Sequence, residues 1–506
     1  MAGSVVTAGR EAAAWKTLGA AAGTGALVVL ASPGVLPWKA AGLIAWVSFV
    51  PLLLVLPRLD LRRAALHGWV AGLVFQAGAA SWYPGLMARY SGMSPAVAVA
   101  LGLLIWSLQA LPWALWCAVA RALSRSSATV AMLATAAAFA AVERFVPVVF
   151  RGPIALTQAA FPAVAQVAEP AGIHAVSWLI IVASFALAEA LDRARRRWVA
   201  VGAGALIVAA VPCLGAWRVH AVRAQRSHGD SMRVGVLQEA RIPQGWGKPP
   251  ADEGVASRYQ EATAQLEVEQ GALDLVVWPE KAWPELVRSD ARHDYPDGHA
   301  RRIRRGFSSR LLFGLTTVEV VSRAVANSAA VLEPDGKLTV FYDKVKLIPY
   351  SEAGYRRGNR TAPYDVGGVG VGTLICFEST FAGHVAELAD PAGVLVNLTD
   401  DTWFGASAEP EQHFAHAVYR AIETRRDVVR ASAAGPSACI AATGEVVAKT
   451  GMGQGRLVCE ARVMRGRGQG WGLGFELVCL AGAIAGLVIQ CRRRSKPETA
   501  SRRFPS

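Results

Sequence analysis

The sequence is poor in charged residues and in cysteine for its length. Asp, Glu, Lys and Arg make up 18% of the 506 residues, whereas about 25% is usual in soluble domains. Seven cysteines are too few for a small disulfide-stapled scaffold, and a hydrophobic fraction of 53% excludes a disordered chain. With a mean hydropathy of +0.32, this composition argues against an ordinary soluble enzyme and predicts that part of the chain lies in a membrane.

The formal net charge of +14 does not indicate a nucleic-acid surface. Residues 217 to 471, the one long stretch without a membrane-length apolar run, hold 31 basic and 30 acidic residues. The excess of basic residues therefore falls in the short loops and tails around the hydrophobic segments. A nucleic-acid-binding protein would concentrate these residues on a folded polar domain, so we expect no nucleic-acid partner.

Eight apolar segments have about the 17 to 25 residues that a helix needs to cross a bilayer. Their approximate spans are 17 to 36, 40 to 57, 64 to 86, 94 to 120, 128 to 150, 172 to 191, 198 to 216 and 472 to 491. The first seven form an expected membrane domain over residues 1 to 216. The last one follows a polar domain expected at 217 to 471 and precedes a basic tail at 492 to 506.

The charges of the loops predict the orientation, because short loops rich in Lys and Arg stay in the cytoplasm. With the N-terminus inside, the loops and tails on the cytoplasmic side hold 17 Lys and Arg, and the short loops on the other side hold 4. Both termini are then cytoplasmic. The domain at 217 to 471 is expected on the extracytoplasmic face.

In that polar domain, short β-branched or apolar runs alternate with amphipathic stretches, which is typical of an α/β or layered α+β domain. Strands are predicted at 232 to 238, 273 to 278, 310 to 317, 326 to 332, 338 to 342, 370 to 376, 393 to 398, 436 to 441 and 445 to 449. Helices are predicted at 251 to 270 and 410 to 429, the second with Phe414, Val418, Ile422 and Val429 at helical spacing. Hairpin turns are predicted at 334 to 336 and 443 to 445.

Three polar residues stand at the carboxyl ends of predicted strands, where such sheets open into sites. They are Glu280, Lys344 and Cys376. A thiol needs a base or a neighbouring cation to become a nucleophile at neutral pH, so a carboxylate, a lysine and a cysteine form a plausible catalytic set. Each residue alone has an ordinary alternative: a carboxylate that caps a strand end, or a cysteine that packs as a small hydrophobe.

Two histidines on one face of the second predicted helix, His413 and His416, suggest a metal pair. No third ligand is well placed in the sequence, so we expect neither a metal nor another cofactor.

The order of three motifs identifies the family. Trp278-Pro279-Glu280 comes first, Tyr342-Asp343-Lys344 with Leu347-Ile348-Pro349 follows, and Cys376-Phe377-Glu378 comes last. This order resembles the nitrilase (carbon–nitrogen hydrolase) superfamily, and with the flanking apolar segments the chain resembles the apolipoprotein N-acyltransferase family. The resemblance implies a multi-pass α-helical membrane domain and an α/β domain with the nitrilase-like αββα sandwich.

Carried over by this resemblance, Glu280 is the general base, Lys344 the cation that stabilises the oxyanion, and Cys376 the acylated nucleophile. Glu352, Phe377 and Glu378 support them, although an aromatic residue with a hydroxyl is common at the position of Phe377. Trp246 and Trp403 are candidate substrate-binding residues. Glu285, in a second Trp-Pro-Glu, and Lys346 are rivals, but Glu280 ends an apolar strand and Lys344 keeps the family spacing.

The resemblance also implies the reaction. A phospholipid, expected to be phosphatidylethanolamine, donates its sn-1 acyl chain to Cys376, and the resulting thioester acylates the N-terminal amine of a diacylglyceryl-cysteine lipoprotein. The protein is expected in the cell (inner) membrane with its catalytic domain on the periplasmic face. A membrane-attached nitrilase-type amidase and a non-enzymatic transporter or scaffold with a degenerate nitrilase domain remain as alternatives.

Two further expectations concern the polar domain. Cys439 and Cys459 share the oxidising compartment, which permits a disulfide, but the pairing of their strands is open. Apolar side chains at 307 to 313 and around Trp403 either dip into the membrane interface or belong to the protein core.

Overall fold

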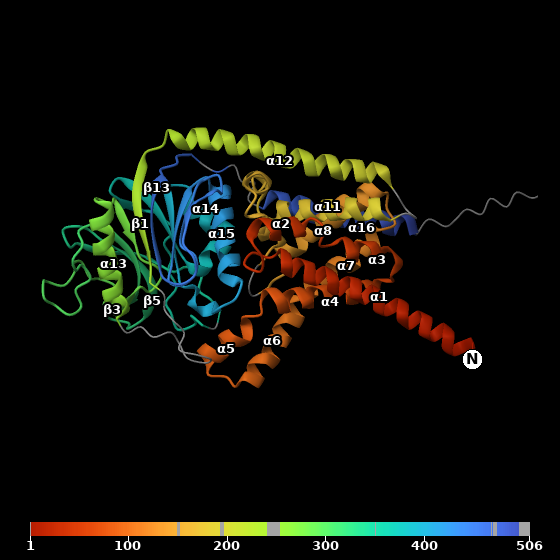
Figure 1. The fold of residues 1–506 in the computed structure, drawn as a ribbon, viewed down its shortest axis with the longest axis horizontal. Helices are drawn as coiled ribbons and strands as arrows, with labels where there is room; N and C mark the ends of the chain where they lie inside the picture. Colours follow the sequence, from red (N-terminus) through yellow and green to blue (C-terminus); the bar gives the residue numbers. More distant parts are fainter. Residues whose placement is uncertain are drawn as a thin grey trace, which may run out of the picture.

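Helices form the first part of the chain and two β-sheets form the second, as the computed structural model shows (Figure 1). The structure describes residues 2–148, 152–192, 197–239, 254–349, 351–466, 468 and 473–494. The helical part comprises α1 (Ala2–Ala31), α2 (Trp38–Ala45), α3 (Val50–Val55), η1 (Leu56–Arg58), α4 (Leu61–Ala79), α5 (Tyr83–Ser91), α6 (Pro95–Gln109), α7 (Leu111–Leu123), α8 (Ala128–Phe145), η2 (Ile154–Gln158), α9 (Pro162–Ala165), α10 (Ala168–Ala171), α11 (His174–Leu191), α12 (Trp198–Ser227) and, after the sheets, α16 (Gly474–Arg494).

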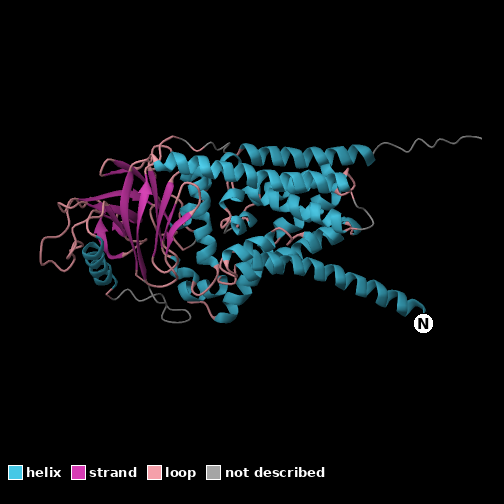
Figure 2. Cartoon of the chain, turned by 45° about the horizontal axis from the view of Figure 1, so that its top comes forward, coloured by secondary structure: helices cyan, strands magenta, loops and turns pink. Residues whose placement is uncertain are grey.

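Each of the eight apolar segments contains helix. Within the described residues, five helical stretches are long and apolar enough to cross a membrane: Trp38–Arg58, Pro95–Leu123, Ala128–Phe145, His174–Leu191 and Trp198–Ser227. Trp15–Ala31 and Gly474–Gln490 are shorter apolar helices. The chain is a membrane protein, and its apolar helices pack side by side in one half of the molecule (Figure 2).

Two of the expected spans end earlier than the hydrophobic pattern predicts. The segment expected at 64 to 86 divides into α4 and α5, and α5 begins at Tyr83 with Pro84 in its first turn. The segment expected at 128 to 150 stops at Phe145, two residues before Pro147. Both breaks follow from proline, which favours the first turn of a new helix and disfavours helical backbone just before it.

Helix α12 joins the helical part to the sheets. It continues to Ser227, past the boundary expected at residue 216, and runs along one side of the molecule before β1 begins (Figure 1). Arg218 on this helix lies 2.6 Å from Glu169, and Arg226 lies 2.7 Å from Asp427 of the second part. These ion pairs fix α12 against both halves of the chain.

The second part is a sandwich of two sheets between two layers of helices. The first sheet has the order β13-β1-β2-β4-β5-β6 with β3 beside β4, and the second has the order β12-β11-β10-β9-β8-β7. Helix α13 covers the first sheet, and α14 and α15 lie between the second sheet and the helical part (Figure 1). This is the αββα arrangement that the resemblance to the nitrilase superfamily implies.

The bounds of these elements follow the chain. They are β1 (Ser231–Gln238), α13 (Val255–Gln270), β2 (Leu275–Val277), β3 (Trp283–Arg288), β4 (Leu311–Val318), β5 (Val325–Leu332), β6 (Leu338–Asp343), β7 (Tyr364–Val366), β8 (Val369–Ile375), η3 (Cys376–Thr380), α14 (Ala382–Ala389), β9 (Val394–Thr399), η4 (Asp401–Phe404), α15 (Glu409–Thr424), β10 (Asp427–Ser432), β11 (Ala438–Ile440), β12 (Val446–Lys449) and β13 (Gly455–Arg462). Both predicted hairpin turns are present, with Gly336 and Gly444 at positive φ.

The carboxyl end of the helix predicted at 410 to 429 is wrong. Helix α15 stops at Thr424, Arg425 takes a left-handed conformation with φ of 54°, and Val429 lies in β10. Residues 427 to 432 pair in parallel with β9, and this tertiary pairing overrides the helical spacing of the apolar residues. Strands β3, β7, β10 and β13 and helix α14 were not predicted.

A disulfide links the two sheets. Cys439 lies on β11 of the second sheet and Cys459 on β13 of the first, and the two sulfur atoms are bonded. The pairing that the sequence leaves open is therefore formed in this structure. It ties the two layers together at the edge where β13 and β11 lie close.

The two halves of the molecule meet along α15. The hydroxyl of Tyr419 donates to the carbonyl of Ala155 at 2.5 Å, and the rings of Trp38 and Phe414 lie 5.3 Å apart. Elsewhere in the sandwich, Phe307 and Phe313 are buried around Trp278. Of the two alternatives for the apolar side chains at 307 to 313, the structure supports the second, in which they belong to the protein core.

Candidate active site

The three residues predicted to carry the chemistry meet between the two sheets. Glu280 follows β2, Lys344 follows β6 and Cys376 follows β8, so each lies just beyond the carboxyl end of its strand. The side chains are buried, and Lys344 has no exposed surface. Its Nζ lies 3.2 Å from Glu280 Oε1. The sandwich thus places a carboxylate, a cation and a thiol in one enclosed site.

The carboxylate of Glu280 is held by three hydrogen-bond donors. Its Oε1 accepts from Lys344 Nζ and, at 2.7 Å, from Asn327 Nδ2, and its Oε2 accepts from the backbone N–H of Asp400 at 2.9 Å. Gly314 packs against its backbone, and a Cβ there would lie 2.6 Å from the Cα of Glu280. Burial alone would raise the pKa of Glu280, but Lys344, Lys281 and Asn327 hold this pKa below its ordinary value. The group is therefore ionised at neutral pH.

Lys344 lies between two carboxylates. Its Nζ donates to Glu352 Oε1 at 2.9 Å as well as to Glu280. Burial would lower the pKa of Lys344, but Glu280 and Glu352 raise it above its usual range. Glu352 is itself held by the N–H of Ile348 at 2.8 Å and by Asn327 at 3.0 Å. Glu352 thus lies beside Lys344 in the structure, as the family resemblance implies.

Cys376 begins the turn η3 with a left-handed backbone, at φ of 52°. A residue other than glycine rarely adopts this conformation, and its strain is held by the surrounding structure. The carbonyl of Cys376 accepts from Ser379 Oγ at 3.0 Å and lies 3.2 Å from His413 Nε2. Burial and the nearby charge of Glu280 raise the pKa of the thiol, although Lys344 opposes them. The resting group is a thiol, which needs a base to react.

Glu378 connects the segments that carry Lys344 and Cys376. Its Oε1 accepts from the N–H of Val345 at 2.7 Å, and its Oε2 accepts from the N–H of Ile375 at 2.8 Å and from the hydroxyl of Tyr342 at 2.7 Å. This buried carboxylate holds the end of β8 against the end of β6. Its neighbour Phe377 packs edge-on against Phe381, with ring centroids 4.9 Å apart.

Sequence reasoning missed two parts of the site. Asn327 on β5 bridges Glu280 and Glu352, and its one sequence signal is a polar side chain inside an apolar strand. Asp401 accepts from the guanidinium of Arg430 at 2.5 Å and lies 2.8 Å from His413 Nδ1. Burial opposes ionisation of Asp401, but Arg430 and His413 hold its pKa well below its usual range.

His413 therefore faces Asp401 on one side and the backbone of the cysteine on the other. Within the described part of the chain, no group of three His, Cys, Asp or Glu is arranged to hold a metal ion. Both ring nitrogens of His413 have neighbours in the structure, since Nδ1 lies 2.8 Å from Asp401 Oδ1 and Nε2 lies 3.1 Å from Ser379 Oγ.

The remaining candidates lie in different places. Trp246 falls outside the described residues. Trp403 lies half-buried on η4, and its carbonyl accepts from Arg89 of α5 at 2.6 Å. Glu285 pairs with Arg301 on the surface of β3, away from the three buried groups. Lys346 has its ammonium 5.8 Å from the ring centroid of Phe381.

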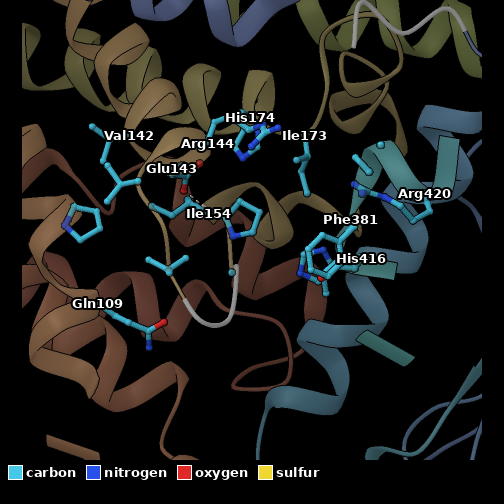
Figure 3. Close-up of a pocket in the computed structure, with 18 of the residues that line it drawn as sticks. Gln109, Val142, Glu143, Arg144, Ile154, Ile173, His174, Phe381, His416 and Arg420 are labelled. Carbon is cyan, nitrogen blue, oxygen red and sulfur yellow. Dashed lines mark hydrogen bonds between the residues drawn. The ribbon is translucent and has the colours of Figure 1, made fainter. Parts of the chain in front are cut away.

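A cavity of about 400 Å³ separates the helical part from η3, α14 and α15. Figure 3 shows Glu143, Arg144 and His174 on one side of it and Phe381, His416 and Arg420 on the other. Cys376 is not one of its lining residues, but Thr380 and Phe381 at the end of the cysteine turn are. The cavity thus adjoins the segment that carries the nucleophile candidate.

Comparisons with known proteins match both halves of the chain. Residues 24–186 match the family model described as the apolipoprotein N-acyltransferase N-terminal domain, and residues 233–472 match the carbon-nitrogen hydrolase model. A protein named apolipoprotein N-acyltransferase from Geobacter metallireducens is 27% identical over 93% of this chain and 95% of its own length. One of the same name from Pseudomonas putida is 29% identical over 85% of this chain and 87% of its own.

Among solved structures, Nit3 of Saccharomyces cerevisiae, a member of branch 10 of the nitrilase superfamily, is 18% identical with a TM-score of 0.36. The match covers 54% of this chain and 97% of that chain. The two family models together reach from within α1 to just before α16.

Proposed function

Because the chain belongs to the apolipoprotein N-acyltransferase family, within the nitrilase superfamily, we propose that Glu280, Lys344 and Cys376 carry its acyl transfer. The protein is a membrane-bound acyltransferase that N-acylates lipoproteins. The proposal concerns which residues act, which molecule donates the acyl group and how the protein is oriented in the membrane. Its support is the geometry of the buried site.

In the first half-reaction, Glu280 takes the thiol proton of Cys376 while the sulfur attacks the ester carbonyl of a phospholipid. The carbonyl oxygen becomes an oxyanion beside the ammonium of Lys344. An ammonium has three N–H donors, and the two glutamates accept two of them, which leaves one for this oxygen. Collapse of the intermediate breaks the ester bond, and Glu280 returns the proton to the leaving alkoxide. The products are a Cys376 thioester and a lysophospholipid.

In the second half-reaction, the α-amine of a diacylglyceryl-cysteine lipoprotein attacks the thioester carbonyl. Glu280 accepts the amine proton, Lys344 again faces the oxyanion, and the carbon–sulfur bond breaks. The thiolate of Cys376 regains the proton from Glu280, and the lipoprotein leaves with a new amide. Burial of the site protects the thioester from water between the two steps.

The donor is proposed to be a phospholipid, with phosphatidylethanolamine the expected one, because the turn that begins at Cys376 adjoins a cavity lined on its other side by the apolar helices. The extracytoplasmic orientation, with both termini in the cytoplasm of the inner membrane, is supported by the loop charges. The disulfide between Cys439 and Cys459 supports it too, since such bonds persist in oxidising compartments.

The single observation that carries the proposal is the lysine between two buried glutamates beside a strained, buried cysteine. Transfer of a labelled sn-1 acyl chain from phosphatidylethanolamine to a synthetic diacylglyceryl-cysteine lipopeptide tests it, with the product followed by mass spectrometry. We expect acylated lipopeptide and lysophospholipid in equal amounts from the wild type and neither from Cys376→Ala. Release of free fatty acid or hydrolysis of an amide without lipopeptide product would favour the amidase alternative.

A further inference from the structure

Three segments that are far apart in the sequence place buried polar side chains next to the backbone of Cys376. Asp401 comes from η4, His413 from α15 and Arg430 from β10, and all three are buried. His413 Nδ1 lies 2.8 Å from Asp401 Oδ1, and the guanidinium of Arg430 donates to Asp401 Oδ2 at 2.5 Å. None of these groups takes part in the two half-reactions described above.

The surroundings of Asp401 suit an ionised carboxylate. Its Oδ2 also accepts from Ser432 Oγ at 3.0 Å, and a Cβ at Gly435 would collide with the same oxygen, so only glycine leaves room for it. Burial opposes ionisation, but Arg430 and His413 hold the pKa of Asp401 well below its usual range. An ionised carboxylate only accepts hydrogen bonds, so Nδ1 of His413 carries the proton between the two groups.

The other nitrogen of the ring faces the backbone of the cysteine. His413 Nε2 lies 3.2 Å from the carbonyl oxygen of Cys376 and 3.1 Å from Ser379 Oγ. Ser379 has a single hydroxyl proton, which it donates to the same carbonyl at 3.0 Å. A lone pair on Nε2 would then face two acceptor oxygens, whereas an Nε2–H donates to both. The contacts therefore fit a ring that has a proton on each nitrogen.

We propose that His413 is a positioning residue for acyl transfer, which donates its Nε2–H to the carbonyl of Cys376 and so holds the nucleophile in place. The inference rests on the proposed function only in that Cys376 is taken as the nucleophile. This cysteine has a φ of 52°, a conformation that a residue other than glycine keeps only when its surroundings hold it. A hydrogen bond to its carbonyl fixes the peptide plane that follows it, and with it the position of the sulfur.

The segment that holds the histidine also holds the base. The N–H of Asp400 donates to Glu280 Oε2 at 2.9 Å. The side chain of the next residue, Asp401, accepts from His413. Two adjacent residues thus connect the general base to the backbone of the nucleophile. Loss of the His413 contact lets the cysteine turn move relative to Glu280, and proton transfer between them depends on that distance.

A serine nucleophile is the alternative role for this set of side chains. Ser379, His413 and Asp401 follow one another in the order of a Ser-His-Asp triad. In such a triad the serine hydroxyl donates to the histidine, whereas Ser379 donates to the carbonyl of Cys376. Ser379 also has no exposed surface. Support of the cysteine turn is therefore the role that these contacts favour.

The test compares two replacements of the histidine in the full-length protein in detergent. The side chains of glutamine and methionine have the same length, but only glutamine has an N–H donor where Nε2 lies. We expect His413→Met to form the thioester about 10- to 100-fold more slowly than His413→Gln, the value of one hydrogen bond that involves a charged group. The loss is expected in kcat, with KM for phosphatidylethanolamine unchanged, because the ring contacts the cysteine backbone.

The matched control is His67, a buried histidine on α4 whose Nδ1 lies 2.7 Å from the carbonyl of Arg63. His67→Gln and His67→Met are expected to form the thioester at the wild-type rate. If His413→Met does not fold, His413→Asn replaces it, since asparagine reaches only as far as Nδ1. Equal rates for the folded His413→Gln variant and the variant without the donor overturn the inference, because a purely structural role predicts them.

The outcome is separable from that of the proposed function. Wild-type protein that forms no thioester refutes the proposed function, and this inference falls with it. Wild-type protein that forms the thioester, together with equal rates for His413→Gln and His413→Met, leaves the mechanism intact and overturns this inference alone. An acyl adduct that is present in Cys376→Ala and absent in Ser379→Ala would assign the nucleophile to the serine and overturn both.

Discussion

The ammonium of Lys344 lies 2.9 Å from the carboxylate of Glu352, and both groups are buried. Glu280 lies on the other side of the same ammonium at 3.2 Å. A charge in a protein interior is tolerated when it is paired and hydrogen-bonded, and here two carboxylates share one ammonium. Glu280 is thus ionised, and its carboxylate shares the ammonium of Lys344 with Glu352.

Replacing the lysine tests this balance. We expect Lys344→Met to lower the rate of thioester formation by at least about 100-fold, because the oxyanion loses its cationic donor. The buried glutamates also lose their counter-charge, so the melting temperature in detergent falls. Intact-mass kinetics and thermal unfolding measure the two effects.

Lys337→Met is the matched control, since Lys337 lies exposed on the hairpin between β5 and β6. Its rate is expected to equal that of the wild type. A rate for Lys344→Met within tenfold of the wild type would show that the lysine does not stabilise the oxyanion.

Asn327 is predicted to set the acidity of Glu280. In Asn327→Leu, Glu280 loses a hydrogen bond of 2.7 Å that favours its ionised form. The pKa of Glu280 then rises, and the acid limb of the pH–rate profile for thioester formation moves to higher pH. We also expect a rate loss of about 10- to 100-fold at neutral pH from the removal of one charged hydrogen bond. An acid limb that stays in place would argue for a purely structural role.

The wild-type pH dependence follows from two opposite shifts. The pKa of Glu280 is lowered and that of the Cys376 thiol is raised, so the resting pair is carboxylate and thiol at neutral pH. The rate of thioester formation is expected to rise as Glu280 loses its proton below its ordinary pKa and to stay level through neutral pH.

The same protonation state predicts slow alkylation. Iodoacetamide reacts with thiolates, so Cys376 at pH 7 is expected to react more slowly than a free cysteine does. Mass mapping of the modified residue gives the rate. Alkylation faster than that of free cysteine would contradict the resting thiol and would favour a preformed ion pair with Lys344.

The disulfide between Cys439 and Cys459 is expected to stabilise the folded protein without affecting the rate of acyl transfer. It closes a loop with a sequence separation of 20 residues, so the chain-entropy model gives about 3 kcal/mol of stabilisation. The double variant Cys439→Ser with Cys459→Ser is expected to unfold at lower temperature and to keep its rate of acyl transfer at moderate temperature.

The same disulfide tests on which side of the membrane the sandwich domain lies. In intact cells both cysteines are expected to resist maleimide labelling until a reductant is added, because the domain lies in the oxidising compartment. Complete labelling without reductant would contradict the extracytoplasmic placement of the domain.

The sequence predicted the positions of the three candidate residues because each belongs to a short motif at a strand end. It did not identify Asn327 or the contacts of Asp401, since these arise from segments far apart in the chain. Asn327 and Glu280 are 47 residues apart and Asp401 and Arg430 are 29. Such contacts depend on how the two sheets pack, which local patterns do not encode.

The layered fold was predictable from alternating strands and helices and from the family motifs, but local endings were not. Val429 continues the helical spacing of α15, yet it pairs with β9 because the parallel partner Val396 lies beside it. Likewise, the hydrophobicity of residues 64 to 86 gives no sign of the break between α4 and α5, which comes just before Pro84. Hydrophobicity reports burial, whereas strand pairing and proline decide where an element ends.

The most direct test of the account is the intact mass of the purified protein after incubation with phosphatidylethanolamine, before and after hydroxylamine. The account predicts that the wild type acquires an adduct of one acyl chain and that hydroxylamine removes it. It predicts that Cys376→Ser acquires no adduct with the hydroxylamine lability of a thioester. Folded, lipid-supplied wild-type protein that acquires no adduct, or an equally labile adduct on the Cys376→Ser variant, would contradict the claim that Cys376 carries the acyl chain.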